Sequence, residues 1–554
     1  MKNINKTLLA LGFGLAFTTQ AEACTSFLVG KNASADGSAF ITYNQDDYGM
    51  FGRLNYFPAA VHAPGTMRTI IDGDSNHYLG QIPEAPQTYA VMGYINEHQV
   101  GITETTFGGR SELVDPKGTI DYVSLMTIAL QRSKTAREAI KVMTDLVQEY
   151  GYASSGESFS IADPNEIWIL EMIGKGPKEK GTVWVAVRIP DDCIASHANH
   201  SRIHQFDMND KENVMYAKDV ISFARKQGYF KGKDKDFSFS KAYAPADFGA
   251  IRYCEARVWS FYNKWVEGMD KYVDYVDGHH MGQADPMPLY FKAKQKLSLQ
   301  DVMNSMRDHY EGTPFDITQD VGAGIYKTPY RPTPLEWEHN GKTYFNERPI
   351  STQQTGSSVV VQMRANMPNA IGGVLWFAND DPNMAPYTPV YCSATQAPAC
   401  YDDKTANGVK FSWASAFWVQ NWVANMTYPR YSQLFPSVEI ERNTIEGECI
   451  TAQREVEKKA NQMYSQNPTE AVKFLTTYSG NCAQQMLESW KKLGEYLIVK
   501  YNDMTIKPET NGKFDMTPDG LGVRPVRTGF SEDFREVIVK ETGDRYLVPS
   551  VPNK

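Results

Sequence analysis

The feature that most constrains the fold of this chain is the junction at residues 21–30, AEACTSFLVG, where a secretion-type leader meets a cysteine and the start of a strand. Two lysines precede an apolar run over residues 8–17, and the small residues of an A-x-A cleavage site follow. The apolar run is too short to span a bilayer. We therefore expect residues 1–23 to be a cleaved signal peptide and Cys24 to begin a mature chain that is exported to the periplasm or out of the cell.

Cleavage before Cys24 would place a thiol and a free α-amine on one residue. An α-amine has a pKa of about 7.7–8.0, far below that of lysine, so it can act as a base at neutral pH. A nucleophile and its base would then share Cys24. Two other interpretations stay open: a cysteine that only forms a disulfide, and a lipid-modified cysteine, although such sites usually carry a Leu-like residue where Ala21 stands.

The composition indicates a globular protein with a large core. Its hydrophobic content is 42% over 554 residues, and its formal charge of −9 comes with scattered Lys and Arg, so we expect no nucleic-acid partner. We also expect no integral membrane segment after signal cleavage. The cysteines include no C-x-x-C pair, which disfavours zinc ribbons and thioredoxin-type chemistry. Export permits disulfides, and spacing favours Cys392 with Cys400 and then Cys449 with Cys482, although pairing cannot be deduced from sequence.

The residues that follow Cys24 predict a β-hairpin. Residues 25–29 suit a strand, a D-G pair supplies a turn, and residues 39–44 suit a return strand. The second strand would bring Asp46 back to the end where Cys24 lies. We expect a carboxylate there to hold and orient the new α-amine; the alternative is an ordinary polar loop.

The same region carries a family resemblance. The pattern C-T-x-x-L-V-G-K-x-A-S-x-D-G-S over residues 24–38, followed by N-x-D at 44–46, resembles the start of the C69 dipeptidases. These are N-terminal-nucleophile (Ntn) hydrolases related to penicillin V acylase and choloylglycine hydrolase. The resemblance implies catalysis by Cys24 with Asp46 beside its amine. The chain departs from the pattern at Tyr43, where many family members carry arginine, so Tyr43 is expected only to line the substrate site.

A second motif, NEHQVGITETTFGGR at residues 96–110, resembles the family pattern NEHxVxIxETTxGGR. It is expected to form a strand, a turn and a strand along the site wall. Thr106 aligns with an oxyanion-hole residue of the acylase relatives, and a threonine offers a hydroxyl or a backbone N–H there. Arg110 could bind a substrate carboxylate as a bidentate fork, or be a surface arginine.

A third motif, HANHSRI at residues 197–203, resembles the family pattern HANxxRI. The resemblance implies that Asn199 donates its side-chain N–H to the tetrahedral oxyanion; removal of such a donor typically costs about 10²–10³ in rate. His197, His200 and His204 raise the alternative of zinc, but no H-E-x-x-H or other zincin spacing is present. We therefore expect no metal and no cofactor.

A helix expected near residue 252 would bring a positive charge to the site. Alignment with the acylase relatives makes Arg252 the arginine that approaches the nucleophile, where it would lower the thiol pKa and favour the thiolate. Arg257 is the neighbouring candidate for this role. A last motif, MRDHYEGTPFD at residues 306–316, resembles another C69 signature.

Hydrophobic periodicity predicts the remaining elements. They are helices at 122–131 and from a Thr135 cap to Gly151, strands at 158–161, 166–173, 182–189, 358–363 and 373–377, and a helical hairpin over 445–503. This order, without a Gly-rich phosphate loop, favours an α+β chain of largely antiparallel sheets. The resemblance implies a four-layer αββα Ntn-hydrolase sandwich. We expect one catalytic domain at 24–444, with a helical hairpin and irregular tail at 445–554 packed on it.

The function that the resemblance implies is that of an exported cysteine dipeptidase acting on small peptides, with Cys24 as nucleophile and its α-amine as base. The acylase relatives leave a second possibility, an amidase acting on N-acyl amino acids, bile-salt conjugates or penicillin-like amides. A third, from another class, is an inactive exported binding protein on the same fold, with Tyr43 as an early sign of lost activity. The sequence also permits a homo-oligomer.

Overall fold

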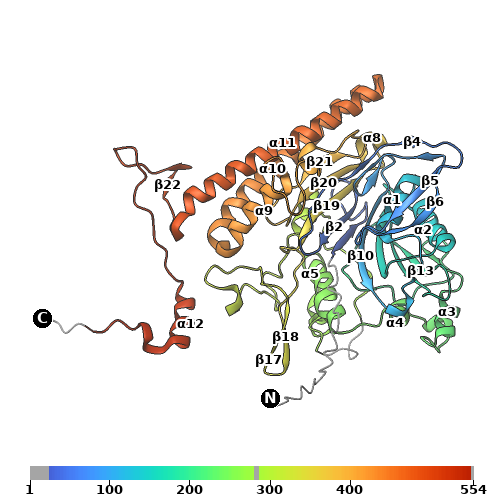
Figure 1. The fold of residues 1–554 in the computed structure, drawn as a ribbon, viewed down its shortest axis with the longest axis horizontal. Helices are drawn as coiled ribbons and strands as arrows, with labels where there is room; N and C mark the ends of the chain where they lie inside the picture. Colours follow the sequence, from blue (N-terminus) through green and yellow to red (C-terminus); the bar gives the residue numbers. More distant parts are fainter. Residues whose placement is uncertain (1–23, 280–285, 551–554) are drawn as a thin grey trace, which may run out of the picture.

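The computed structural model describes residues 24–279 and 286–550, and the predicted signal peptide at residues 1–23 lies outside this range. Two β-sheets pack face to face, and helices cover both outer faces (Figure 1). Neighbouring strands of both sheets pair antiparallel. The predicted four-layer αββα sandwich of the Ntn hydrolases is therefore confirmed.

The first sheet has seven strands in the order β16-β14-β1-β2-β19-β20-β21. In chain order these are β1 (Ser26–Val29), β2 (Ala39–Asp46), β14 (Cys193–His197), β16 (Tyr290–Lys292), β19 (Thr355–Met363), β20 (Val374–Asn379) and β21 (Thr388–Tyr391). β1 and β2 form the predicted hairpin, with Leu28 opposite Ile41. Gly30 follows β1 at a place where a Cβ would lie 2.3 Å from the carbonyl oxygen of Asp191, so only glycine permits this close approach of the two backbone segments.

The second sheet has eight strands in the order β15-β13-β12-β11-β10-β9-β8-β3. In chain order these are β3 (Tyr56–Phe57), β8 (Val91–Met92), β9 (Ile95–Asn96), β10 (Gly101–Gly108), β11 (Gly156–Ala162), β12 (Ile167–Gly174), β13 (Thr182–Ile189) and β15 (Val214–Tyr216). Every residue of β11 and β12 is buried. Layers on both faces explain why β12 reads as a nearly continuous apolar run, IWILEMIG, instead of an alternating one.

Two helices, α1 (Tyr122–Arg132) and α2 (Ala136–Tyr150), cover the outer face of the second sheet. The Asp121 side chain caps α1, and the Thr135 side chain caps α2 by accepting from a main-chain N–H of the first turn. Gly151 ends α2 with a φ of +79°, which other residues rarely adopt. Thr135 and Gly151 are the two ends that the sequence pattern predicted for α2.

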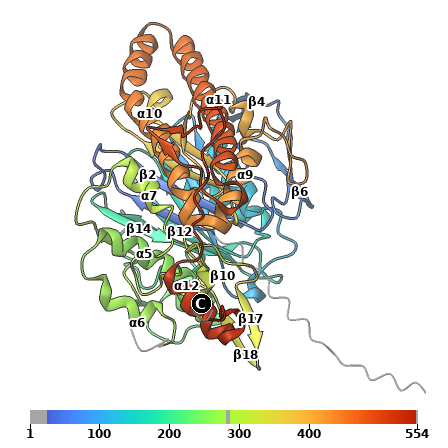
Figure 2. The same ribbon diagram turned by 90° about the vertical axis from the view of Figure 1, so that its left-hand side faces the viewer.

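The outer face of the first sheet packs against α5 (Ala256–Trp265), α7 (Leu299–Ser305), α10 (Tyr431–Gln466) and α11 (Pro468–Tyr501). α10 and α11 form a long hairpin whose tip projects beyond the sheets (Figure 2). The other helices are α3 (Val220–Gln227), α4 (Phe239–Tyr243), α6 (Val273–Val276), α8 (Asn369–Gly372), α9 (Ala416–Thr427) and α12 (Glu532–Thr542). The boundary that we placed between residues 444 and 445 falls inside α10.

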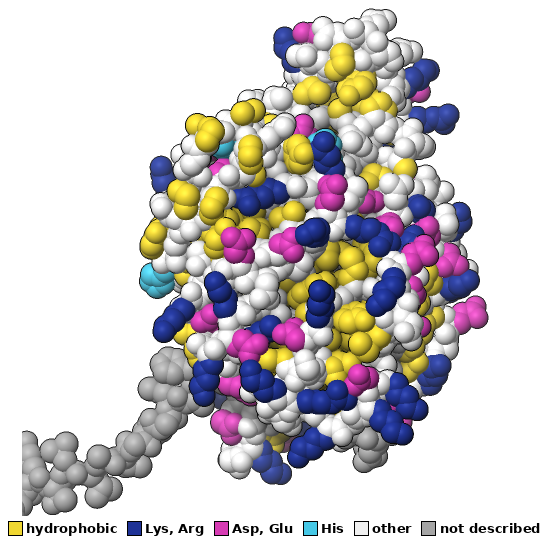
Figure 3. Space-filling view, turned by 90° about the vertical axis from the view of Figure 1, so that its right-hand side faces the viewer, with side chains coloured by type: hydrophobic (Ala, Val, Ile, Leu, Met, Phe, Trp, Pro, Cys, Tyr) yellow, Lys and Arg dark blue, Asp and Glu magenta, His cyan; other side chains and the backbone are white. Residues whose placement is uncertain are grey.

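Smaller elements lie outside the sandwich. Four two-stranded sheets pair β4 (Ala60–Val61) with β7 (Gln87–Thr88), β5 (Met67–Ile71) with β6 (Tyr78–Pro83), β17 (Glu336–His339) with β18 (Lys342–Phe345), and β22 (Glu509–Thr510) with β23 (Lys513–Phe514). The chain after α11 leaves the body as an arm that ends in α12, which buries none of its residues (Figure 1). On the face in Figure 3, positive and negative side chains intermingle around hydrophobic patches. In the described ranges, we find no helix with the length and apolarity to cross a membrane.

All seven cysteines of the chain lie among the described residues, and each is a free thiol. Cys392 donates to the carbonyl oxygen of Asn369 at 3.2 Å, so the pairing with Cys400 that spacing favoured is not formed. Cys449 on α10 and Cys482 on α11 hydrogen-bond to each other as thiols. Of the two pairs that spacing favoured, the packing of two helices thus brings only the second together.

Candidate active site

The pairing of β1 with its two neighbours brings Cys24 to a crowded end of the first sheet. Thr25 exchanges two main-chain hydrogen bonds with Asn44, of 2.9 and 3.3 Å, near the end of β2. Ser26 pairs with His197, the last residue of β14. Cys24 therefore lies between the end of β2 and the segment that follows β14.

Side chains from distant segments hold both main-chain polar groups of Cys24. Its N–H donates to Oδ1 of Asn199 at 2.8 Å, and its carbonyl oxygen accepts from the Arg257 guanidinium at 2.6 Å. Arg257 also donates to the same Asn199 oxygen at 3.0 Å. Asn199 has a φ of +57°, which asparagine tolerates better than most residues. Cys24 is thus fixed by contacts to two later motifs.

The side-chain amide of Asn199 has a contact that the resemblance did not indicate. One of its N–H groups donates to the carbonyl oxygen of Thr106 at 2.8 Å, and donation to an oxyanion stays a prediction. The amide oxygen faces Cys24 and Arg257. An amide side chain presents an acceptor on one side and donors on the other, so its neighbours decide its orientation. In this structure Asn199 therefore holds the nitrogen of Cys24.

A π-helical turn, Ala250–Glu255, comes directly before α5 and decides which arginine reaches Cys24. Arg252 lies within this turn and forms an ion pair with Glu347. Arg257, in the first turn of α5, is fully buried and makes the contact with Cys24. A π-turn has i→i+5 hydrogen bonds and so shifts every later residue around the helix axis. The contact with Cys24 that we expected of Arg252 is therefore made by Arg257, the neighbouring candidate. No sequence pattern marks the turn that sets this register.

The Cys24 thiol lies against a tyrosine and a carboxyl group. Its Sγ is 3.4 Å from the Tyr43 hydroxyl and 3.7 Å from Oε1 of Glu104, and Tyr43 donates to the same Glu104 oxygen. Burial raises the pKa of Cys24 well above its ordinary value, and the charges of Glu104 and Asp46 raise it further. We expected an arginine to lower this pKa; the shift is the reverse, first because the thiol is buried and then because carboxyls face Sγ. The thiol is therefore protonated at neutral pH.

Asp46 is the last residue of β2, and its side chain is buried. Its Oδ1 accepts from the Thr355 hydroxyl at 2.6 Å, whereas Oδ2 has no hydrogen-bond partner among the described residues. Burial raises the pKa of Asp46 to about 7, against the effects of the Thr355 bond and of the charges of Arg348 and Arg257. Asp46 affects the pKa of the Cys24 thiol in two ways: its charge raises this pKa, and its main-chain N–H lowers it. It lies at the end of the sheet where we expected it.

The two residues indicated by the second motif lie in different surroundings. The carbonyl oxygen of Thr106 accepts from Asn199, and its hydroxyl donates to Glu157 at 2.7 Å. Arg110 donates to a main-chain oxygen of α4 at 2.7 Å and lies over the ring of Tyr229, 3.9 Å from its centroid. The structure therefore joins Thr106 to the surroundings of Cys24, and it places Arg110 against Tyr229.

Two of the three histidines in and after the third motif, His197 and His204, contact hydroxyl groups. His197 bridges Thr105 and Ser160 with two contacts of 2.7 Å, and burial lowers its pKa to about 3, so the ring is neutral. His204 contacts Ser238 at 3.1 Å. Within residues 24–279 and 286–550, no group of three or more His, Cys, Asp or Glu side chains is arranged to hold a metal ion.

Glu104 is the residue that the sequence reasoning missed. It lies in the middle of β10 within the second motif, and its side chain is fully buried. Burial raises its pKa to about 7; hydrogen bonds from Tyr43 and Glu157 oppose this shift, and the charge of Asp74 adds to it. The available signal was a glutamate inside a predicted strand. Carboxylates are almost never fully buried unless they are paired, so a buried one indicates a special environment.

These side chains form one cluster, called the Cys24 centre below. Its members are Cys24, Tyr43, Asp46, Glu104, Asn199 and Arg257. A four-layer sandwich of this topology, with a buried cysteine leading into a central strand, defines the class of the Ntn hydrolases. The chain belongs to peptidase family C69, whose profile matches residues 23–443 and so includes the whole centre. By family it is a peptide hydrolase.

Three relatives are similar over most of their length. A probable dipeptidase of Salmonella dublin is 30% identical over 407 residues, which are 70% of this chain and 84% of the relative. A probable dipeptidase of Latilactobacillus sakei is 27% identical over 499 residues, 87% of this chain and 96% of the relative. Dipeptidase A of Lactobacillus helveticus is 26% identical over 465 residues, 79% of this chain and 89% of the relative.

Proposed function

We propose that this protein is an exported dipeptidase of the cysteine type, in which Cys24 begins the mature chain and its α-amine is the catalytic base. The names of the three relatives support dipeptides as substrates. The observation that carries the mechanism is the 2.8 Å contact between the Cys24 nitrogen and Oδ1 of Asn199. This contact gives the Cys24 nitrogen a hydrogen-bond acceptor on Asn199, and that nitrogen belongs to the same residue as the thiol.

In the mature chain, Asn199 would accept one N–H of the Cys24 amine and so orient the nitrogen lone pair. The thiol is neutral, because its pKa is raised by burial and by Glu104 and Asp46. Its proton therefore passes to the amine as sulfur attacks the substrate carbonyl carbon. Asp46, whose charge reaches Cys24, stabilises the ammonium that forms.

The remaining steps return this proton. As the C–N bond of the tetrahedral intermediate breaks, the Cys24 ammonium protonates the departing amino group and leaves a thioester of the N-terminal residue. Water then attacks the thioester while the amine accepts a proton from it. As the C–S bond breaks, the ammonium returns this proton to sulfur, and release of the free N-terminal amino acid leaves the thiol and the free amine.

The test compares protein that begins at Cys24 with protein that begins at Ala23. The extra alanine converts the base into an amide N–H, which cannot accept a proton, so hydrolysis of a small dipeptide panel should be lost while circular dichroism stays the same. A chain with one alanine added after Lys554 controls for the added residue and should stay active. Equal rates from the two N-termini, with the extra alanine confirmed by mass spectrometry, would exclude this mechanism.

Export needs a separate measurement. Intact-mass and N-terminal analysis of the protein from the cells that make it should show a chain that starts at Cys24 without a lipid. A mature chain that starts at Met1, or a diacylglycerol on Cys24, would contradict both the processing and the mechanism.

A further inference from the structure

Glu104 is a buried carboxyl without a cationic partner. Its side chain is 0% exposed, and it forms no ion pair with a lysine, arginine or histidine of the described residues. Oε1 accepts from Tyr43, and Oε2 receives no hydrogen bond from an N–H or hydroxyl group in the described part of the chain. The neighbouring Glu157 carboxyl can donate to Glu104 only when it is protonated.

Two other buried glutamates of this chain pair with arginines. Glu255 pairs with Arg202 at 2.7 Å, and Glu457 pairs with Arg364 at 2.6 Å. A buried carboxylate is costly unless it is paired. Since Glu104 lies against Sγ of Cys24, the cation that completes its surroundings would come with the substrate.

We infer that Glu104 binds the α-ammonium of the substrate, so that the enzyme requires a free N-terminal amine and rejects N-acyl amides. This inference rests on the proposed dipeptidase function and names the residue that selects the substrate. It separates dipeptides from the N-acyl amino acids, bile-salt conjugates and penicillin-like amides that the sequence left open.

The geometry of a peptide fits this position. In a dipeptide the N-terminal nitrogen is two bonds from the carbonyl carbon that is attacked, at about 2.5 Å. Sulfur approaches that carbon at about 3–3.5 Å before reaction, which leaves the ammonium a few ångströms from Sγ. Oε1 of Glu104 is 3.7 Å from Sγ, within hydrogen-bond reach of an ammonium placed in this way.

The same geometry disfavours the other amides. In an N-acyl amino acid, a bile-salt conjugate or a penicillin-like amide, the carbonyl group that is attacked belongs to an acyl chain without an α-ammonium. Glu104 would then have no cation, which is the unpaired arrangement that proteins avoid. Selectivity of this kind comes from leaving a buried group unsatisfied with the wrong substrate.

The experiment uses protein that begins at Cys24 and two substrates that differ only in the ammonium, Ala-Ala and propionyl-alanine. The wild type should prefer Ala-Ala by about 10²-fold or more in kcat/KM. Glu104→Gln should lower the Ala-Ala value by about 10²-fold and change propionyl-alanine by less than about threefold, since losing one partner of a buried charge pair has effects of this size. Glu104→Asp keeps the charge and should keep a reduced preference for Ala-Ala.

Glu171→Gln is the matched control. Glu171 is also a buried carboxyl whose pKa burial raises to about 7, but its partners are Ser201 and the main chain of Arg202 and Ile203. This variant should keep the wild-type ratio between the two substrates. Near-UV circular dichroism checks that each variant is folded.

The outcomes separate the inference from the function on which it rests. Dipeptide hydrolysis with an unchanged substrate ratio in Glu104→Gln would overturn the ammonium site and leave the dipeptidase proposal standing. Equal rates for the two substrates in the wild type would also overturn it. If the wild type cleaves neither, calorimetry with Cys24→Ala decides: selective binding of Ala-Ala that Glu104→Gln abolishes supports the site without the activity, and equal or absent binding of the two compounds overturns it.

Discussion

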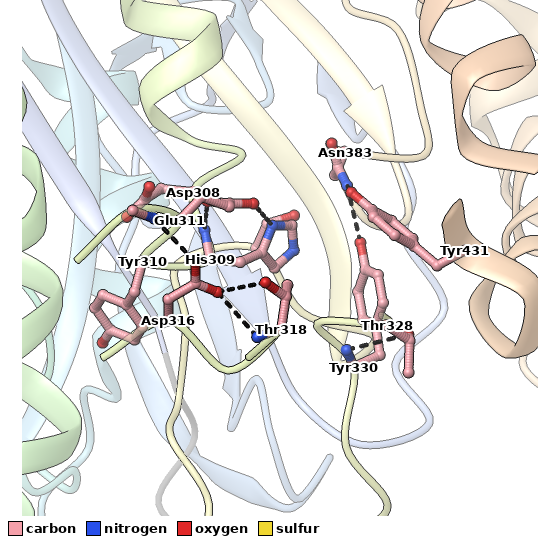
Figure 4. Close-up of polar contacts among 12 residues, drawn as sticks. Asp308, His309, Tyr310, Glu311, Asp316, Thr318, Thr328, Tyr330, Asn383 and Tyr431 are labelled. Carbon is pink, nitrogen blue, oxygen red and sulfur yellow. Dashed lines mark hydrogen bonds and ion pairs between the residues drawn. The ribbon is translucent and has the colours of Figure 1, made fainter. Parts of the chain in front are cut away.

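The Cys24 centre and the loop at residues 306–318 both coincide with sequence motifs, yet their charges are arranged in opposite ways. At the centre, Asp46 and Glu104 form no salt bridge within the described residues, and burial raises the pKa of each to about 7. In the loop, Glu311 contacts His309 at 3.0 Å (Figure 4). Burial alone would lower the pKa of His309, but the Glu311 charge outweighs it, and the same pair lowers the pKa of Glu311.

The other acidic groups of the loop also have partners. The Asp316 carboxylate turns back into its own loop, where it accepts from the main chain of Gly312 at 3.0 Å and from the hydroxyl of Thr318 at 2.6 Å (Figure 4). Asp308 forms an ion pair with Lys264. In this loop the charges are compensated, so they stabilise one backbone conformation.

That conformation supports the centre. The side-chain amide of Asn44, on the strand that carries Asp46, donates to the carbonyl oxygens of Met306 and Ile350 at 3.1 and 2.9 Å. The comparison teaches that a motif can mark either chemistry or the support for it. Compensated charges indicate support, whereas buried carboxyls beside a thiol reduce stability and are retained where they serve a function.

The largest expected effect is at the proposed nucleophile. Cys24→Ser, in a chain that begins at residue 24, should lose turnover by about 10³-fold or more, because the hydroxyl ionises far less readily than a thiol and the amine is a weak base. Its melting temperature should stay near that of the wild type. Steady-state kinetics on a dipeptide and a thermal scan measure both, and full activity in a correctly processed variant would contradict the assignment.

Removing a charge of the loop should instead lower stability and leave the activity nearly unchanged. Arg307 and Glu446 form a buried ion pair, so Arg307→Ala should lower the free energy of unfolding by about 3–5 kcal/mol. The kcat of the folded protein should change by less than about threefold. Urea unfolding and active-site titration test this, with Arg535→Ala, in an exposed pair with Glu532, as a control that should be indistinguishable from the wild type.

Asp46→Asn is expected to lower kcat by about 10–10², with little change in KM, because the ammonium of Cys24 loses its counter-charge. A variant that changes only KM would place Asp46 in substrate binding. The effect is smaller than that of Cys24→Ser because nucleophile and base both remain. Kinetics with saturating dipeptide separate the two parameters.

The same variant tests the raised pKa of Asp46 through the pH dependence of stability. The pKa of Asp46 is about 7 in the folded protein and about 4 in an unfolded chain, so between these values the folded state binds the proton more strongly. The contribution of Asp46 to the unfolding free energy therefore falls as pH rises through this window, and Asp46→Asn should remove that fall of up to about 1.4 kcal/mol per pH unit. Urea unfolding from pH 4 to pH 7 measures the slope, and equal slopes would contradict the raised pKa.

Glu311 should change the pH dependence of the unfolding free energy in the opposite direction. Because its pKa is lowered in the folded state, its contribution is present above its ordinary pKa and is lost as pH falls below that value. Glu311→Gln should therefore destabilise the protein at pH 7 and flatten the loss of stability in acid.

The smallest expected effect is that of Tyr43→Phe. It removes the hydroxyl that contacts both Sγ and Glu104 while keeping the ring. We expect kcat/KM for a dipeptide to fall about 3–10-fold, as for one lost hydrogen bond of about 1 kcal/mol in the site. A decrease above 10²-fold would indicate that Tyr43 takes part in catalysis. No change would mean that Tyr43 only lines the site.

Much of the fold could be predicted because the patterns that produce it are local. The strand predicted at 182–189 matches β13, and the helix predicted to run from a Thr135 cap to Gly151 matches α2. The hairpin after Cys24 followed from a turn pair between two apolar runs. Within the site, the motifs correctly indicated that Asp46 and Asn199 lie near Cys24, because each follows directly from the end of a strand in the same sheet.

What the sequence by itself determined is the order of elements, the α+β class and the place of Cys24 at the start of a strand, since periodicity and turn chemistry act over a few residues. The sandwich followed from the family resemblance of its motifs. Tertiary structure alone decided that Arg257 replaces Arg252, that the Asn199 oxygen faces the Cys24 nitrogen, and that Glu104 lies 3.7 Å from the thiol. These features depend on a π-turn, on neighbours far along the chain and on burial. The pKa of a carboxyl follows from its surroundings, and residues from distant segments supply those surroundings.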